Sequence, residues 1–119
     1  MNIFISQPMR GLSEDQIMEV RQEVIDEFLK IKMTPADTPF YFMNNYDHPN
    51  LAADANPLLY LGEDIEMMAD ADMIIFVEGW DRARGCIIEH KICHYYDLKY
   101  IYAVKKDDGN WGFRTDEQN

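Results

Sequence analysis

Three charged side chains from separate segments of the chain could act together: Arg10, Asp64 and Glu89. An arginine can hold a small anionic group, and a pair of carboxylates can supply an acid and a base or nucleophile. Each residue also has a plain interpretation. Glu89 could simply interact with the positive end of a helix dipole. Asp64 could be a solvated helix residue, and Arg10 could be a charge on a surface loop.

Other reactive side chains lie in the same region of the sequence. Trp80 could cap the core or stack on a nucleobase. Glu89, His90, Cys93 and His94 could form a metal set, because two histidines four residues apart lie on one helix face. The H-E-x-x-H pattern is absent, however, and we predict no metal site. Cys86 is a weak candidate nucleophile because no histidine base is evident beside it.

The elements that must position these residues alternate between strands and helices. Apolar runs predict strands, and apolar residues at helical spacing predict helices. A capping box at Ser13 and Gln16 starts the first helix, and Asn56 with Pro57 starts the second. Strands are expected at Asn2–Ser6, 38–43, Met73–Val77 and 98–104, and helices from Ser13 to about Lys32, from Pro57, and from near Gly85.

This alternation predicts an α/β fold of the small Rossmann-like or flavodoxin-like kind. We expect about four parallel strands in the order 2-1-3-4, with helices on both faces. Pro39 favours an edge position for the second strand. In the second helix, the expected buried side consists of Leu58, Leu61, Ile65 and Met68. The loops after parallel strands meet at one edge of the sheet, which would bring Arg10, Asp64 and Glu89 together.

Composition and charge restrict the partners. With 119 residues the chain has the size of one domain. Its net charge of −11 disfavours nucleic-acid polymers but not a small anionic ligand near local arginines. Cys86 and Cys93 lie too far apart on one helix for a disulfide, which suggests a reducing cytoplasm. No apolar run is long enough to span a membrane, so no membrane association is expected.

Two segments resemble a family of small phage and bacterial proteins related to nucleoside 2-deoxyribosyltransferases and deoxynucleoside monophosphate N-glycosidases. The first, FISQPMRGL, is similar to the family's opening Y-I-S-G-P-M-x-G-L. The second resembles D-x3-M-x2-A-D-x-I-x4-G-W-x4-G-x3-E-H, from Asp64 to His90. The resemblance implies a nucleoside deoxyribosyltransferase-like domain over residues 1–104, followed by a polar C-terminal arm over residues 105–119.

The resemblance also implies an activity and the residues that perform it. Glu89 would attack the anomeric carbon of a nucleoside or nucleoside 5′-monophosphate, and Asp64 would protonate the departing base. The result would be N-glycosidic cleavage or 2-deoxyribosyl transfer, with no cofactor. The family forms homodimers or higher homo-oligomers. Substrate-binding positions would be Ser6, Gln7, Arg10, Gly11, Gly79, Trp80, Arg84 and Gly85.

Three positions depart from the family pattern. Phe4 replaces a tyrosine whose hydroxyl would orient the nucleophile, and phenylalanine cannot make that hydrogen bond. Gln7 replaces a glycine, and Ala83 replaces a polar residue that contacts the ligand. Arg82 and Arg84 flank Ala83 and could contact a phosphate instead. The alternative function is therefore a protein that binds a nucleotide, for sequestering or sensing, without turnover.

Overall fold

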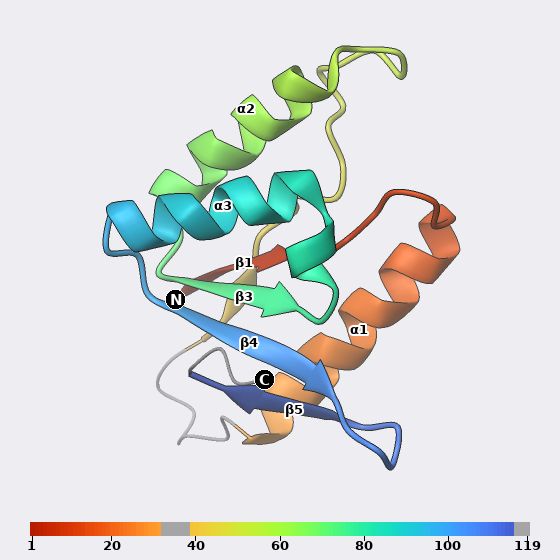
Figure 1. Ribbon diagram of the computed structural model, residues 1–119, viewed down its shortest axis with the longest axis vertical. Coiled ribbons are helices and arrows are strands. Elements are labelled where there is room, and N and C mark those ends of the chain that lie inside the picture. Colours follow the sequence, from red (N-terminus) through yellow and green to blue (C-terminus); the bar gives the residue numbers. More distant parts are fainter. Residues whose placement is uncertain (32–38, 116–119) are drawn as a thin grey trace.

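The computed structural model describes residues 1–31 and 39–115, which form one mixed sheet with three α-helices (Figure 1). The strands pair in the order β2-β1-β3-β4-β5. In chain order the elements are β1 (Asn2–Ser6), α1 (Glu14–Ile31), β2 (Tyr41–Phe42), α2 (Pro57–Ala69), β3 (Met73–Val77), the short 3-10 helix η1 (Trp80–Arg82), α3 (Arg84–Tyr95), β4 (Tyr100–Lys105) and β5 (Trp111–Arg114).

The α/β class and the parallel order 2-1-3-4 are confirmed, but the expected number of strands is corrected. Strands β2, β1, β3 and β4 pair in parallel, whereas β5 pairs antiparallel with β4. Within the segment predicted as a polar arm, Trp111 is buried and Phe113 packs against the core. These two aromatic side chains, two residues apart, hold the fifth strand on the sheet.

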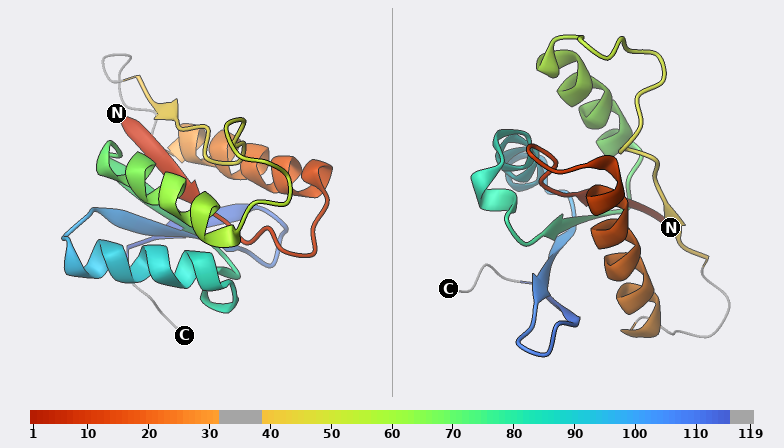
Figure 2. Two further views of the ribbon diagram at one scale, coloured as in Figure 1. Left: turned by 90° about the horizontal axis from the view of Figure 1, so that it is seen from above. Right: turned by 90° about the vertical axis from the view of Figure 1, so that its right-hand side faces the viewer.

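Helices cover both faces of the sheet, as expected. Strands place alternate side chains on opposite faces, so Ile3 and Ile5 of β1 join the core beneath α1, with Val24 and Phe28. On the opposite face, the core beneath α2 and α3 contains Phe4, Ile74, Phe76, Met68 and Cys93. Figure 2 shows α2 and α3 side by side on this face, with α1 on the other.

The predicted helix starts are confirmed by their hydrogen bonds. The backbone N–H of Gln16 donates to Ser13 Oγ at 3.2 Å, and the Ser13 N–H donates to Gln16 Oε1 at 2.9 Å. Asn56 Oδ1 accepts from the Leu58 N–H at 3.0 Å, and Pro57 opens α2. The predicted end of α1 near Lys32 lies outside the described residues.

The predicted buried side of α2 is wrong for two of its four residues. Met68 is buried, but Leu58 and Ile65 are exposed, with 69% and 38% of their surfaces accessible. Leu59, with 53% accessible, adds to this apolar surface. The helix periodicity identified an apolar stripe, but this chain buries only the C-terminal part of α2 against the sheet.

Candidate functional site

An open cavity of about 920 Å³ lies at the carboxyl ends of β1 and β3. From β1 the chain passes to β2 on one side and then crosses to β3 on the other, so these two strands border the switch point where open α/β sheets hold ligands. The cavity is lined by Ser6, Gln7, Pro8, Met9, Arg10, Leu12, Val20, Asn45, Asp64, Val77, Glu78, Gly79, Arg82, Ala83, Arg84, Gly85, Cys86, Glu89 and Trp111.

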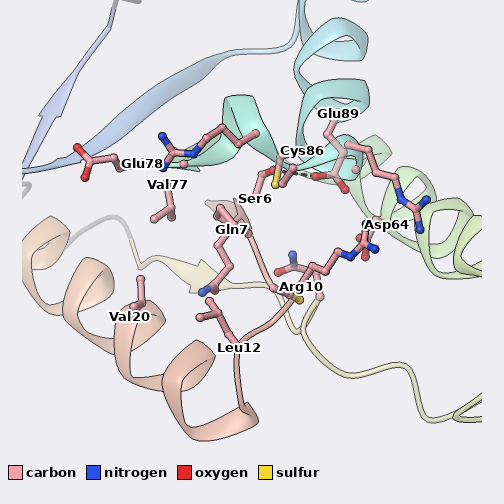
Figure 3. A pocket seen from close by; sticks show the side chains of 18 of the residues that line it. Ser6, Gln7, Arg10, Leu12, Val20, Asp64, Val77, Glu78, Cys86 and Glu89 are labelled. Carbon is pink, nitrogen blue, oxygen red and sulfur yellow. Dashed lines mark hydrogen bonds between the residues drawn. The ribbon is translucent and has the colours of Figure 1, made fainter.

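Glu89 reaches the cavity from the second turn of α3 and is only 4% exposed. The Ser6 hydroxyl, at the end of β1, donates a hydrogen bond to Glu89 Oε1 at 2.7 Å (Figure 3). Burial raises the pKa of Glu89, and hydrogen bonds to Ser6 and Asp64 oppose this rise. Ser6 therefore orients this carboxylate and stabilises its ionised form.

Asp64 lies on α2 and faces the same end of the cavity as Glu89 (Figure 3). Burial, followed by the negative charge of Glu89, raises the pKa of Asp64 to about 8. Two neighbouring carboxylates cannot both ionise easily, so the pair shares one proton near neutral pH. The hydrogen bonds favour Asp64 as the protonated acid and Glu89 as the anion, which are the two roles that paired carboxylates take in glycosyl chemistry.

Sequence reasoning missed His48, a half-buried residue in the long loop between β2 and α2. Its Nδ1 lies 2.7 Å from Glu63 Oε1, and its Nε2 lies 3.4 Å from Asp64 Oδ1. The ring also packs edge-on against Tyr60, with 5.0 Å between ring centroids. A single histidine among Asn, Asp and Pro residues carries no periodic signal. The only sequence signal for it is the length of this loop, because long loops in compact domains are usually functional or mobile.

A buried network holds the start of that loop against the sheet. Arg21 of α1 donates to the Met43 carbonyl at 2.6 Å and to Asn45 Oδ1 at 3.3 Å. The Asn45 amide in turn donates to the Ile5 carbonyl at 2.7 Å. Asn45 itself lines the cavity, so Arg21 fixes one wall of the site through it.

The loop after β1 contributes side chains on the α1 side of the sheet edge. Gln7 is 5% exposed, and its Nε2 donates to the Ile17 carbonyl at 3.1 Å. Its Oε1 has no hydrogen-bond partner among the described residues, although it is buried at the cavity. Arg10 is exposed and lines the cavity, whereas the predicted site residue Gly11 does not.

The loop after β3 brings Gly79, Arg84 and Gly85 to the cavity, together with Arg82. Gly79 has a φ of +96°, and a Cβ there would lie 3.2 Å from Pro8 Cγ, so the two loops approach closely at this glycine. Trp80 does not line the cavity. Its ring stacks on His90 at 4.1 Å between centroids, within the aromatic core.

The alternative nucleophile and the metal set receive no geometric support. Burial raises the pKa of the Cys86 thiol to about 12, so it is a poor nucleophile. His90 Nε2 lies 2.7 Å from the Tyr102 hydroxyl, and His94 is exposed at the surface. Within residues 1–31 and 39–115, no group of three or more His, Cys, Asp or Glu residues is arranged to hold a metal ion.

Comparisons with known proteins found no matching family model, no matching curated protein and no matching solved structure. Among the described helices, none is both long and apolar enough to cross a membrane.

Proposed function

We propose that the protein cleaves the N-glycosidic bond of a nucleoside or nucleoside 5′-monophosphate, by hydrolysis or by 2-deoxyribosyl transfer. The observation that carries this proposal is the pair of interacting carboxylates, Glu89 and Asp64, at one end of an open cavity. The resemblance of the two sequence segments to nucleoside deoxyribosyltransferases and related glycosidases supports the same chemistry.

In the first step, a Glu89 carboxylate oxygen bonds to the anomeric carbon as the bond from that carbon to the base nitrogen breaks. Asp64 gives its proton to the departing base, which leaves neutral. In the second step, water or a second base attacks the anomeric carbon and the ester to Glu89 breaks, while Asp64 takes the proton from the attacking group. Ser6 holds the attacking carboxylate throughout.

Three arginines support a nucleotide rather than a nucleoside as the substrate. Arg10, Arg82 and Arg84 all line the cavity, in a protein whose net charge is −11. A phosphate bound there would gain charge-assisted hydrogen bonds from guanidinium groups. The unpaired Oε1 of Gln7 is an acceptor for an N–H or O–H group of the same ligand.

The second candidate is a protein that binds a nucleotide without turnover, and Phe4 and Ala83 favour it. Phe4 is fully buried in the core, and Ala83 presents only a methyl group to the cavity. The substitution Phe4→Tyr tests this explanation. A faster reaction would mean that the missing hydroxyl limits turnover, whereas an unchanged rate would mean that Ser6 alone suffices to orient Glu89.

The experiment for both candidates is chromatography of pooled deoxynucleosides and their monophosphates after incubation with the protein. Glu89→Ala is the control. Free base that forms only with the unmodified protein supports cleavage and identifies the substrate. A single nucleotide that is depleted from the filtrate and recovered intact after denaturation supports the binding protein. If neither outcome is observed, the cavity does not have the proposed function.

We also propose that the chain forms a homodimer or a higher homo-oligomer. Support comes from exposed apolar side chains on the neighbouring helices α2 and α3, which are Leu58, Leu59, Ile65, Ile88 and Tyr95, and from the exposed Tyr96 at the C-cap of α3. Apolar surface of this kind is typical of protein interfaces. Sedimentation of the protein and of Ile65→Glu tests it. A mass twice that of the chain or more, reduced by the substitution, is expected.

A further inference from the structure

The cavity extends from the carboxylate pair to a second part on the α1 side of the sheet. In Figure 3 the Gln7 side chain points away from Glu89 and toward Leu12 and Val20. We call this part the α1-side lobe, and its lining residues are Gln7, Leu12, Val20, Val77 and Trp111. They come from the loop after β1, from α1, from the end of β3 and from β5. All but Gln7 are apolar, so the Gln7 amide is the main polar group of the lobe.

The Gln7 amide has a fixed orientation and one unused acceptor. The residue is 5% exposed, and its Nε2 donates to the Ile17 carbonyl at 3.1 Å. A reversed amide would bring Oε1 against this carbonyl oxygen, so the hydrogen bond determines which end of the amide is the acceptor. Oε1 is buried and has no hydrogen-bond partner among the described residues. Because a buried acceptor without a donor is unfavourable, a donor on a bound molecule would stabilise this arrangement.

Trp111 is held at the lobe by contacts with α1 and β4. Its Nε1–H donates to Glu23 Oε1 at 3.0 Å, and Lys105 Nζ lies 5.0 Å from the centre of its ring. Lys105 Nζ also lies 3.3 Å from the same Glu23 oxygen, so the three side chains contact one another. The indole N–H is therefore used within the protein, and Trp111 contributes apolar surface to the lobe.

The lobe fits the flat, mostly apolar ring of a nucleobase. A phosphate group would meet no cation among the five lining residues and would face the acceptor oxygen of Gln7. A sugar carries several hydroxyl groups, for which these side chains offer one free acceptor. A nucleobase has two apolar faces and carries N–H groups on the edge remote from the sugar, which is the edge that proteins recognise when a base enters a pocket.

We propose that the α1-side lobe binds the base of the ligand, and that Gln7 Oε1 accepts a hydrogen bond from an N–H group on the remote edge of that base. Leu12, which is 43% exposed, moves aside to let this group reach Oε1. The assignment rests on the proposed function, in which Glu89 bonds to the sugar. The base then extends from the sugar toward α1, and Gln7 determines which bases bind.

The two tryptophans of the chain provide a direct test by NMR, because each gives one indole N–H cross-peak. Trp111 lines the lobe, whereas Trp80 does not line the cavity and serves as an internal control. The probes are the deoxynucleoside 5′-monophosphates of adenine, cytosine, guanine and thymine, and Trp111→Phe assigns the cross-peaks. Titrations use the unmodified protein and Glu89→Gln, in which turnover does not consume the probe. We expect at least one probe to shift the Trp111 cross-peak and to leave that of Trp80 in place.

The role of Gln7 is tested with analogues of the bound probe in which N-methyl groups replace the N–H groups on the remote edge of the base. They should bind the unmodified protein about tenfold more weakly, because Gln7 Oε1 then receives no donor. Gln7→Met keeps the length of the side chain but removes the acceptor, so it should bind the probe about tenfold more weakly and no longer distinguish it from its analogues. Gln22→Met is the matched control, since the Gln22 amide donates to Asp26 on the exposed surface of α1.

Three results would overturn the proposal: a Trp111 cross-peak that no probe shifts, N-methylated analogues that bind the unmodified protein as tightly as the probe, or discrimination that persists in Gln7→Met. The last result would mean that the methyl groups are excluded by their bulk. The analogues test Gln7 in the unmodified protein, so the test holds even if Gln7→Met does not fold. A shifted Trp111 cross-peak without any release of base would support the lobe and refute the proposed cleavage, whereas cleavage without this shift would support the reaction and overturn the lobe.

Discussion

The hydrogen bond from Ser6 to Glu89 is the contact whose removal has the clearest expected effect. It measures 2.7 Å between Ser6 Oγ and Glu89 Oε1, and both side chains are almost fully buried. A hydrogen bond to a charged group contributes about 1.5–3 kcal/mol. Because one pKa unit corresponds to about 1.4 kcal/mol, Ser6→Ala should raise the first pKa of the Glu89–Asp64 pair by roughly 1–2 units.

The assay is the pH dependence of kcat/KM for the substrate that the protein cleaves. Its acidic limb reports loss of the first proton from the pair, which creates the nucleophilic anion. For Ser6→Ala we expect this limb to move upward by roughly 1–2 units, so the rate on the acidic side falls about 10- to 100-fold and recovers as the pH rises.

Ser13→Ala is the control, because it also removes a serine hydroxyl but affects only the start of α1. It should cost about 1 kcal/mol of stability and leave the pH profile unchanged. If Ser6→Ala retains the acidic limb of the unmodified protein, or loses the same factor at every pH, Ser6 does not stabilise the Glu89 anion and the assignment is wrong.

Two further predictions concern stability. The raised pKa of Asp64 means that the folded state binds a proton at this carboxyl group more tightly than the unfolded state does. The contribution of this group to the free energy of unfolding is therefore greatest below about pH 4 and falls as the pH rises toward about 8. Asp64→Asn should therefore stabilise the protein against urea more at pH 8 than at pH 5, and an equal effect at both would contradict the shift. Gly79→Ala should lower stability by about 1–2 kcal/mol because of the positive φ, whereas Gly62→Ala, in open space on α2, should raise it by roughly 0.5–1 kcal/mol. If Gly79→Ala and Gly62→Ala both lowered the stability, the expected opposite effects at these two glycines would be contradicted.

The parallel part of the sheet could be predicted because its strands coincide with apolar runs that are visible in the sequence. Asn2–Ser6 and Met73–Val77 are short apolar runs bounded by turn residues, and both became central strands. The fifth strand could not be predicted in this way. Trp111 and Phe113 are separated by Gly112, and only pairing with β4 gives that short segment its strand geometry.

The candidate site was predictable where it depends on topology. Ser6, Glu89 and Asp64 meet because the carboxyl ends of parallel strands and the following helices share one edge. His48 depends instead on how a long loop folds back against α2, and no periodicity specifies that. The sequence pattern also predicts that Trp80 binds the substrate, but the Trp80 ring packs inward on His90 and does not line the cavity.

The central claim is that Glu89 forms a covalent bond to the sugar, and trapping that bond is the most direct measurement. The protein is mixed with its substrate, quenched in acid within milliseconds, digested and analysed by mass spectrometry. We expect the peptide containing Glu89 to carry the mass of the deoxyribosyl group, with its phosphate if the substrate is a nucleotide, and Glu89→Ala to release no base. Base release by Glu89→Ala at the rate of the unmodified protein would contradict the account.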